Sequence, residues 1–301
     1  MKVTTQGWIN GFIGVAMFSG SLPATRLAVL GLDPFFVTAA RASLAGLMAV
    51  AVVLLARMQR PTRAEWRTLV WVALGVVVGF PLSSALALQT ITSAHSLVFI
   101  GLLPMATAIF GTWLGGERPS RAFWLFAVLG AASVAGFALS QDGSGSLVAD
   151  LLMVVAIVSC GYGYAEGGRL ARRMGGLPVI CWVLVLSLPI SLPLSIALVP
   201  SEVASVPVFA WGGLAYVSVF SMLVGFVFWY RGLAQGGIAA VGQLQLLQPF
   251  MGLLLAAWLL HEPVTPTMLL VTAFVVACVA GAKYTAATPV PAPGTPDATQ
   301  S

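Results

Sequence analysis

Apolar residues fill long continuous stretches of the chain, and polar residues gather in the short gaps between them. A helix that crosses the hydrocarbon core of a bilayer, about 30 Å thick, needs about 20 apolar residues. Runs of about this length lie near residues 7–30, 34–56, 67–89, 94–114, 121–140, 147–168, 178–199, 209–231, 238–260 and 265–284. The pattern therefore predicts an all-α integral membrane protein with about ten transmembrane helices.

One apolar run has a near-copy elsewhere in the chain. The stretch LLPMATAIFGTWLGGERP at 102–119 resembles LLQPFMGLLLAAWLLHEP at 246–263. Tryptophan and glutamate are scarce in this chain, so their recurrence indicates a repeat more strongly than matched leucines do. The matched positions are all 145 residues apart: Pro104 and Pro249, Trp113 and Trp258, Glu117 and Glu262, and Gly136 and Gly281.

The number of predicted helices between the two copies fixes their relative direction. About five helices separate equivalent points, and five is odd, so the second copy crosses the membrane in the opposite direction. Inverted-topology repeats of this kind are characteristic of secondary transporters. We therefore predict a first five-helix repeat over residues 1–140, an inverted second repeat over 147–285 and a disordered cytoplasmic tail over 286–301, which is rich in Pro, Ala and Thr.

Composition and charge support a membrane location. Hydrophobic residues make up 59% of the chain and charged residues only 8%, whereas a soluble domain carries about 25% charged residues. Lys and Arg gather in every second gap, and the other gaps carry acids. By the positive-inside rule, this alternation predicts an even number of spans with both termini in the cytoplasm. We expect a multi-pass protein of a bacterial inner (cytoplasmic) membrane.

Motifs of other functional classes are missing from the sequence. It contains no HExxH, no paired CxxC and no GxxxxGK, and no Ser or Cys nucleophile has evident partners. The three cysteines, Cys160, Cys181 and Cys278, each lie within an apolar run and are expected to pack between helices. We therefore expect no enzyme activity, metal or cofactor, and a channel stays open as an alternative to a carrier. The expected partners are lipid and a small-molecule substrate, without nucleic acid or an obligate protein partner.

The spacing of these motifs, with a proline in the fourth and ninth spans and a glutamate beyond each, resembles the EamA-type branch of the drug/metabolite transporter (DMT) superfamily. The stretch LDPFFVTAARASLAGL at 32–47 is similar to the second span of that family, where an arginine commonly occupies the place of Arg41. The resemblance extends from about residue 7 to 285, and within the superfamily the chain looks most like the YddG-type exporters of aromatic and other amino acids.

This resemblance implies a broad-specificity exporter of aromatic and other neutral amino acids that works by alternating access. The alternative is an exporter of other small metabolites or drugs of the same superfamily, including a proton-coupled one. The chain departs from the family pattern at FSGS (18–21), where the first span often has Trp-Gly, and at SCGYGYAEGG (159–168), where the sixth span often has a Trp. Both spans line the cavity of the family.

Candidate substrate-binding residues begin with three glutamines at the start of the ninth span, Gln243, Gln245 and Gln248. Their counterparts in the fourth span, Val98, Ile100 and Leu103, are apolar. The difference breaks the repeat symmetry by polarity and indicates one wall of a wet cavity; interhelical hydrogen bonding is the alternative. Aromatic rings and a hydroxyl would suit the side chain of a small zwitterion, and packing is again the alternative: Phe80, Ser83, Phe99, Tyr162 and Tyr164.

Two prolines and two glutamates are candidates for hinges or gates. Pro104 and Pro249 lie near the middle of their spans, where a proline would free the carbonyls of Ile100 and Gln245, act as a hinge, or simply kink the helix. Glu117 and Glu262 follow their spans and are interpreted as helix-end contacts or as gating residues.

Charged residues within the spans are few. Arg26 and Arg41 lie in the predicted outer halves of the first two spans, where they either snorkel outward or capture a carboxylate at the outer mouth. His95 is expected at the outer interface, with a proton role as the alternative. Glu166 is the deepest acid and lies close to Arg169, so we expect an ion pair and no proton relay. The sequence therefore favours facilitated transport.

Overall fold

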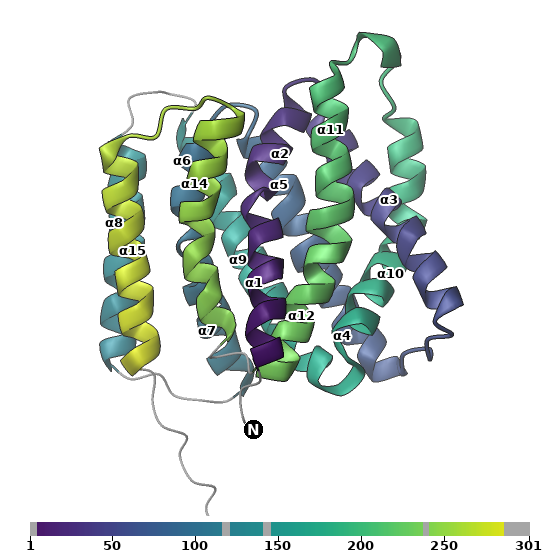
Figure 1. Cartoon of the computed structure of the whole chain (residues 1–301), viewed down its shortest axis with the longest axis horizontal. Coiled ribbons are helices and arrows are strands. Elements are labelled where there is room, and N and C mark those ends of the chain that lie inside the picture. Colours follow the sequence, from purple (N-terminus) through teal and green to yellow (C-terminus); the bar gives the residue numbers. More distant parts are fainter. Residues whose placement is uncertain (1–4, 116–120, 141–145, 237–240, 286–301) are drawn as a thin grey trace, which may run out of the picture.

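The computed structural model of the chain describes residues 5–115, 121–140, 146–236 and 241–285, which form helices and no strands (Figure 1). Two segments, η1 and η3, are π-helices, and two, η2 and η4, are 3₁₀-helices. The elements are α1 (Thr5–Ser19), α2 (Ser21–Val29), α3 (Pro34–Leu55), α4 (Arg63–Ala73), η1 (Leu74–Gly79), α5 (Phe80–Ala87), α6 (Ser93–Ile100), α7 (Leu103–Gly115), α8 (Arg121–Leu139), α9 (Ser146–Met174), α10 (Gly176–Ala197), η2 (Val203–Ser205), α11 (Val208–Tyr216), η3 (Val217–Val224), α12 (Gly225–Gly236), η4 (Gly242–Leu247), α14 (Gln248–Leu259) and α15 (Pro266–Thr285).

Eight helical segments of the described chain are long and apolar enough to cross a bilayer, and two shorter apolar helices, Leu244–Leu259 and Pro266–Gly281, follow them. Each of the ten predicted runs overlaps one of these segments. Large apolar side chains such as Leu55, Ile190 and Val208 are exposed on the outside of the bundle. Exposed apolar side chains over helices whose backbone groups bond internally are what a lipid environment requires.

The ends of the helices have ordinary sequence signals. Asp33 precedes α3, and its carboxylate accepts hydrogen bonds from the N–H groups of Phe35 and Phe36. Thr62 and Glu65 form a reciprocal capping box at the start of α4. Between α9 and α10, Gly175 has a φ of +89°, a left-handed conformation that favours glycine and lets the chain reverse within one residue.

The repeat is visible in the positions at which helices begin. The two π-helices, η1 and η3, interrupt equivalent segments of the two halves, and a second helix starts after a break at equivalent points of the fourth and ninth predicted spans. Three pairs of helix starts are 145 positions apart, the spacing found in the sequence: Arg63 and Val208, Leu103 and Gln248, and Arg121 and Pro266.

The two halves of the chain share one core. The equivalent helices α3 and α10 pack against each other, as do α8 and α15, and these two pairs lie at opposite edges of the bundle in Figure 1. Between them α1 packs against α12, and α9 packs against α4, η1 and α5. A Cβ on Gly75 would lie 2.5 Å from the carbonyl oxygen of Ser159, so the backbones of η1 and α9 are in direct contact. Movement between the halves must therefore slide or tilt these helix pairs.

Candidate functional site

A cavity in the middle of the bundle is lined by residues of both halves. Its empty space, including the part open to solvent, is about 390 Å³. The lining residues come from both halves of the chain: Phe18, Ser21, Leu22, Arg41, Val76, Phe80, Leu103, Cys160, Tyr164, Ser221, Phe226 and Gln248. We call this space the central cavity.

Breaks in the helices converge on the central cavity. Phe18 and Ser21 flank the junction of α1 and α2, and Val76 and Ser221 belong to the two π-helices. Leu103 and Gln248 are the first residues of α7 and α14. Short π segments are frequent at functional sites, and interrupted helices at membrane depth are tolerated where they line a cavity. The placement of these breaks indicates a binding site.

Arg41 supplies the positive charge of the central cavity. Its side chain comes from the N-terminal half of α3, is 3% exposed and belongs to the lining of the cavity. One guanidinium nitrogen, Nη2, donates to Ser221 Oγ at 3.2 Å, and Ser221 Oγ lies 2.7 Å from Ser21 Oγ. Arg41 Nε is buried without a partner, and no carboxylate belongs to the lining of the cavity. A buried cation in this state is costly unless an anion joins it.

The two halves differ in polarity at equivalent lining positions. Gln248 is 5% exposed, and its Oε1 has no hydrogen-bond partner in the described chain. The equivalent of Gln248 in the first half is Leu103, and the equivalent of Ser221 is Val76; all four side chains line the cavity. The second half therefore presents an amide and a hydroxyl where the first half presents two hydrocarbons. A ligand with one polar and one apolar end suits this arrangement.

Aromatic rings close another part of the cavity. The rings of Phe18, Tyr164 and Phe226 contact one another with centroid distances of 5.0–6.2 Å, two of the three pairs edge to face. Phe80 and Cys160 also belong to the lining. Packing between helices was predicted for all three cysteines, and Cys160 is buried as expected, but it also lines the cavity.

Four of the sequence candidates line the central cavity, namely Phe80, Tyr164, Gln248 and Arg41. Four other substrate-binding candidates whose side chains are described do not. Gln245 and Ser83 are buried outside the lining, Phe99 stacks on His95, and Tyr162 lines a separate side pocket with Trp71 and Phe110. For Gln243 only the backbone, in η4, is described.

The two prolines occupy helix starts. Pro104 and Pro249 are the second residues of α7 and α14. The first turn of a helix makes no hydrogen bond through its N–H groups, so a proline there costs the helix no hydrogen bond. The prediction of a free carbonyl at Gln245 is wrong, because that carbonyl accepts a hydrogen bond from the N–H of Gln248 in the tight turns of η4. The hinge role of both prolines stays a prediction.

The other charged candidates make structural contacts. Arg26 Nη1 donates to the carbonyl oxygen of Leu88, beyond the last turn of α5. Glu262 accepts from the N–H and hydroxyl of Ser93 and the N–H of Ala94, at 2.7–3.1 Å, and so caps the start of α6. Glu117 lies outside the described residues.

Of the polar residues that line the cavity, Arg41 and Gln248 were predicted from the sequence, but Ser21 and Ser221 were missed. Ser21 and Ser221 are small and frequent residues, and nothing in their local patterns sets them apart. The only signal was the FSGS stretch at 18–21, whose departure from the family pattern coincides with Phe18 and Ser21 in the lining. Ser221 becomes conspicuous only when Arg41 is seen beside it.

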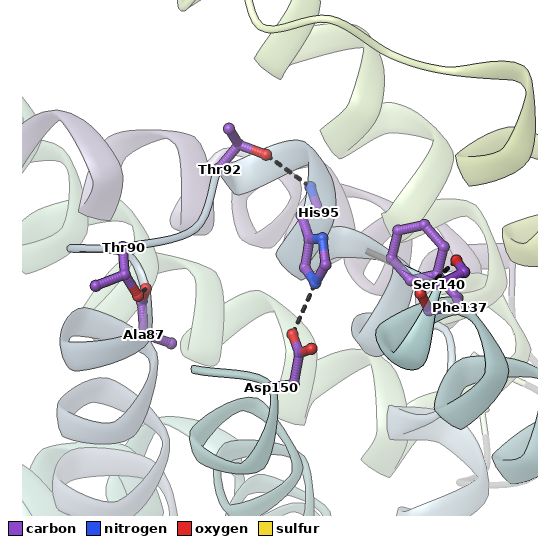
Figure 2. Close-up of polar contacts among 7 residues, drawn as sticks. All are labelled: Ala87, Thr90, Thr92, His95, Phe137, Ser140 and Asp150. Atoms are coloured by element: carbon purple, nitrogen blue, oxygen red, sulfur yellow. Dashed lines mark hydrogen bonds and ion pairs between the residues drawn. The ribbon is translucent and has the colours of Figure 1, made fainter. Parts of the chain in front are cut away.

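A second missed feature lies outside the central cavity. His95 Nε2 and Asp150 Oδ1 are 2.7 Å apart, and both side chains are buried (Figure 2). His95 was expected at the outer interface, whereas the packing of α6 against α9 buries it together with Asp150. The expected pair of Glu166 with Arg169 is present, at 2.8 Å.

Comparison with known proteins agrees with this architecture. The EamA-like transporter family matches the chain twice, over residues 5–139 and 147–282. The chain is 59% identical over 283 residues to the Bacillus subtilis protein named "Uncharacterized transporter YdeK", covering 94% of this chain and 99% of that protein. It is 26% identical to "Uncharacterized transporter sll0355" of Synechocystis, covering 86% and 84%. A solved crystal structure shares the fold, with a TM-score of 0.63 at 20% identity over 92% of this chain and 97% of the matched chain.

Proposed function

The chain belongs to the EamA-like transporter family, and on that premise we propose that it exports amino acids, aromatic and other neutral ones, across the bacterial inner membrane. It does so by alternating access around the central cavity, and the concentration gradient of the substrate drives the flux. The proposal includes ten spans in two inverted repeats, over 1–140 and 147–285, and cytoplasmic termini. The proposed tail, 286–301, lies outside the described residues.

The observation that carries the proposal is the charge of Arg41. A guanidinium held in the middle of the bundle without a carboxylate among the cavity residues prefers an anionic ligand. Arginine pairs with carboxylates through two parallel hydrogen bonds, which require two free donors on adjacent nitrogens. Arg41 Nε has no partner, and Nη2 makes one long bond that a ligand can replace. A substrate carboxylate fits this cation.

The remaining lining suits the rest of an amino acid. The unpartnered Oε1 of Gln248 is an acceptor that an ammonium group can fill. The apolar wall of Val76 and Leu103, with the ring of Phe80, offers room for a hydrocarbon or aromatic side chain and contains no group that selects one shape. Broad specificity for neutral amino acids follows from such a surface.

Alternating access is supported by the symmetry of the backbone. Equivalent helices start 145 positions apart, and the π-helices and breaks occur at equivalent places around the cavity. Two halves of inverted direction can exchange conformations, which would open the cavity first to one side and then to the other.

The second candidate is export of other small metabolites or drugs, for which proton coupling is one variant. The side pocket between α4, η1, α7 and α9 favours it, because its lining of Trp71, Phe110 and Tyr162 is aromatic. The empty space of this pocket, about 680 Å³, opens beside exposed apolar residues, so compounds dissolved in the membrane would reach it directly.

The test is counterflow of a panel of labelled amino acids in proteoliposomes, with and without a pH gradient. We expect saturable exchange of phenylalanine, leucine and other neutral amino acids without the gradient. Failure to exchange any amino acid rejects the substrate class, and strict dependence on the gradient rejects the facilitated mechanism. Flux that does not saturate indicates a channel.

A further inference from the structure

The pair of His95 and Asp150 joins the two halves of the chain. His95 lies in the first turn of α6, whose N-cap Thr92 accepts from the His95 N–H, and Asp150 lies near the start of α9 (Figure 2). Exposed fractions of their side chains are 7% and 5%. The second oxygen of Asp150, Oδ2, is buried without a partner. The contact lies at the end of the bundle where α2 ends and α6 begins, the upper end in Figure 1.

The charges around the pair are few. The elements that pack against α6 are α2, α9, α14 and α15. Arg26 of α2 donates to the carbonyl of Leu88, and Glu262 of the α14–α15 connection bonds to the first turn of α6. No charged residue occurs in α14 or, up to Gly281, in α15, while Asp142 lies outside the described residues. The rings of Phe99 and Phe137 cover the imidazole. Asp150 is the one described carboxylate that contacts it.

We propose that His95 and Asp150 form a proton-binding site that closes the upper end of the transporter. Without an added proton the pair carries one net negative charge in the contact between α6 and α9, which water hardly reaches. We call this contact the seam. With the proton on His95 the two residues form a neutral ion pair of imidazolium and carboxylate, and burial of a neutral pair costs much less than burial of a single charge. The separation of 2.7 Å suits such a charge-assisted bond.

The direction of the pH effect follows from this difference. When the upper end opens, the seam parts and water solvates the Asp150 carboxylate, so the advantage of holding the proton falls. The added proton therefore lowers the cost of keeping the seam closed, and acid on that side favours closure. One linked proton changes the ratio of closed to open molecules by at most about tenfold per pH unit. Both proton uptake and release occur from the upper side, so the site senses pH there without moving protons across.

A distance measurement tests the site without any substrate. We would replace the three native cysteines with alanine, attach spin labels at Gln89→Cys and Val148→Cys, which are exposed on either side of the seam, and place the protein in lipid nanodiscs. The short-distance population should rise as the pH falls from about 8 to 5.5, the range in which histidine titrates. His261 is the only other histidine and is exposed near the same end, so it provides the matched control.

Three variants separate a proton site from a structural contact. His95→Gln keeps a neutral donor but cannot bind the proton, so the pH dependence should vanish and the open state should dominate at every pH. Asp150→Asn removes the charge that burial penalises, so the closed state should dominate near pH 8. A proton on His95 would then lack a carboxylate to pair with, so acid should no longer favour closure. His261→Gln should behave as the wild type. An unchanged pH slope in His95→Gln, or its loss in His261→Gln, overturns the proposal. It rests on the proposed function only for its effect on transport, since the distances are informative even if no amino acid is exported.

Discussion

Replacement of Arg41 is the most direct test of the central cavity, because function and stability should respond in opposite directions. The variant Arg41→Met keeps most of the side-chain volume and removes the charge. Loss of one partner from a buried, hydrogen-bonded ion pair costs about 2–5 kcal/mol of binding energy. If a substrate carboxylate pairs with Arg41, its affinity should fall roughly 30-fold to several thousand-fold.

The stability of the empty transporter should not fall. Arg41 makes one long hydrogen bond, to Ser221, whose net contribution is about 1 kcal/mol, and Ser221 keeps its contact with Ser21 in the variant. Against this bond stands the cost of burying a charge without a counter-ion, which is at least as large. We expect unfolding of Arg41→Met to range from unchanged to more stable by about 2 kcal/mol. Arg41→Lys keeps the charge but not the planar fork, so its affinity should fall about tenfold.

Arg26 is the matched control for this experiment. It is the other arginine of the first two spans, but it donates to a backbone carbonyl and does not line the cavity. Arg26→Met should lower the stability by about 1–2 kcal/mol, since the Leu88 carbonyl loses its partner, and leave the apparent affinity unchanged. Counterflow in proteoliposomes measures affinity, and tryptophan fluorescence during thermal unfolding in detergent measures stability. Wild-type affinity in Arg41→Met, or destabilisation at least as large as in Arg26→Met, refutes a binding role.

Three further predictions follow from the same geometry. Gln248→Leu should reduce affinity about tenfold in counterflow, as expected for loss of one hydrogen bond to a charged group, whereas Gln245→Leu, outside the lining, should keep the wild-type affinity; equal effects would contradict the assignment. Glu262→Gln should lower the unfolding temperature by weakening the cap on α6, at a cost of about 1 kcal/mol, and an unchanged temperature would show that the cap does not contribute. A small charged thiol reagent should inhibit the wild type only slowly, because Cys160, the cysteine of the cavity lining, is 3% exposed and a thiol in apolar surroundings resists ionisation; rapid inhibition that is lost in Cys160→Ala would contradict this burial.

Much of the fold was predictable because membrane helices are specified by long-range averages. A run of about 20 apolar residues is recognised even when one or two of its positions are polar. The repeat spacing of 145 rests on scarce residues such as Trp113 and Trp258. The polarity difference between Gln248 and Leu103 pointed to two positions that line the central cavity, and the binding role of Gln248 stays a prediction. These inferences need only the order of residues along the chain.

The contents of the cavity were less predictable because they depend on helix rotation. Tyr162 and Tyr164 are two residues apart on α9, about 200° around the helix, so one faces the side pocket and the other the central cavity. A sequence does not reveal which. The buried pair of His95 and Asp150 was missed for a related reason. Each residue lies near a predicted helix end, and its burial comes from packing against a segment 55 positions away.

The central cavity separates the two requirements of a carrier into backbone and side chains. Switching between two conformations requires halves that can exchange shapes, and here the symmetry is kept in helix starts, π-helices and breaks. Recognition of a polar, asymmetric molecule requires cavity walls that differ from each other. Here equivalent positions carry different side chains: Ser221 and Val76, Gln248 and Leu103, and Arg41 and Leu186. In the proposed carrier, a substrate bound between these walls would keep one orientation in both states. Under that proposal, the repeat would invert the access of the cavity without inverting its contents.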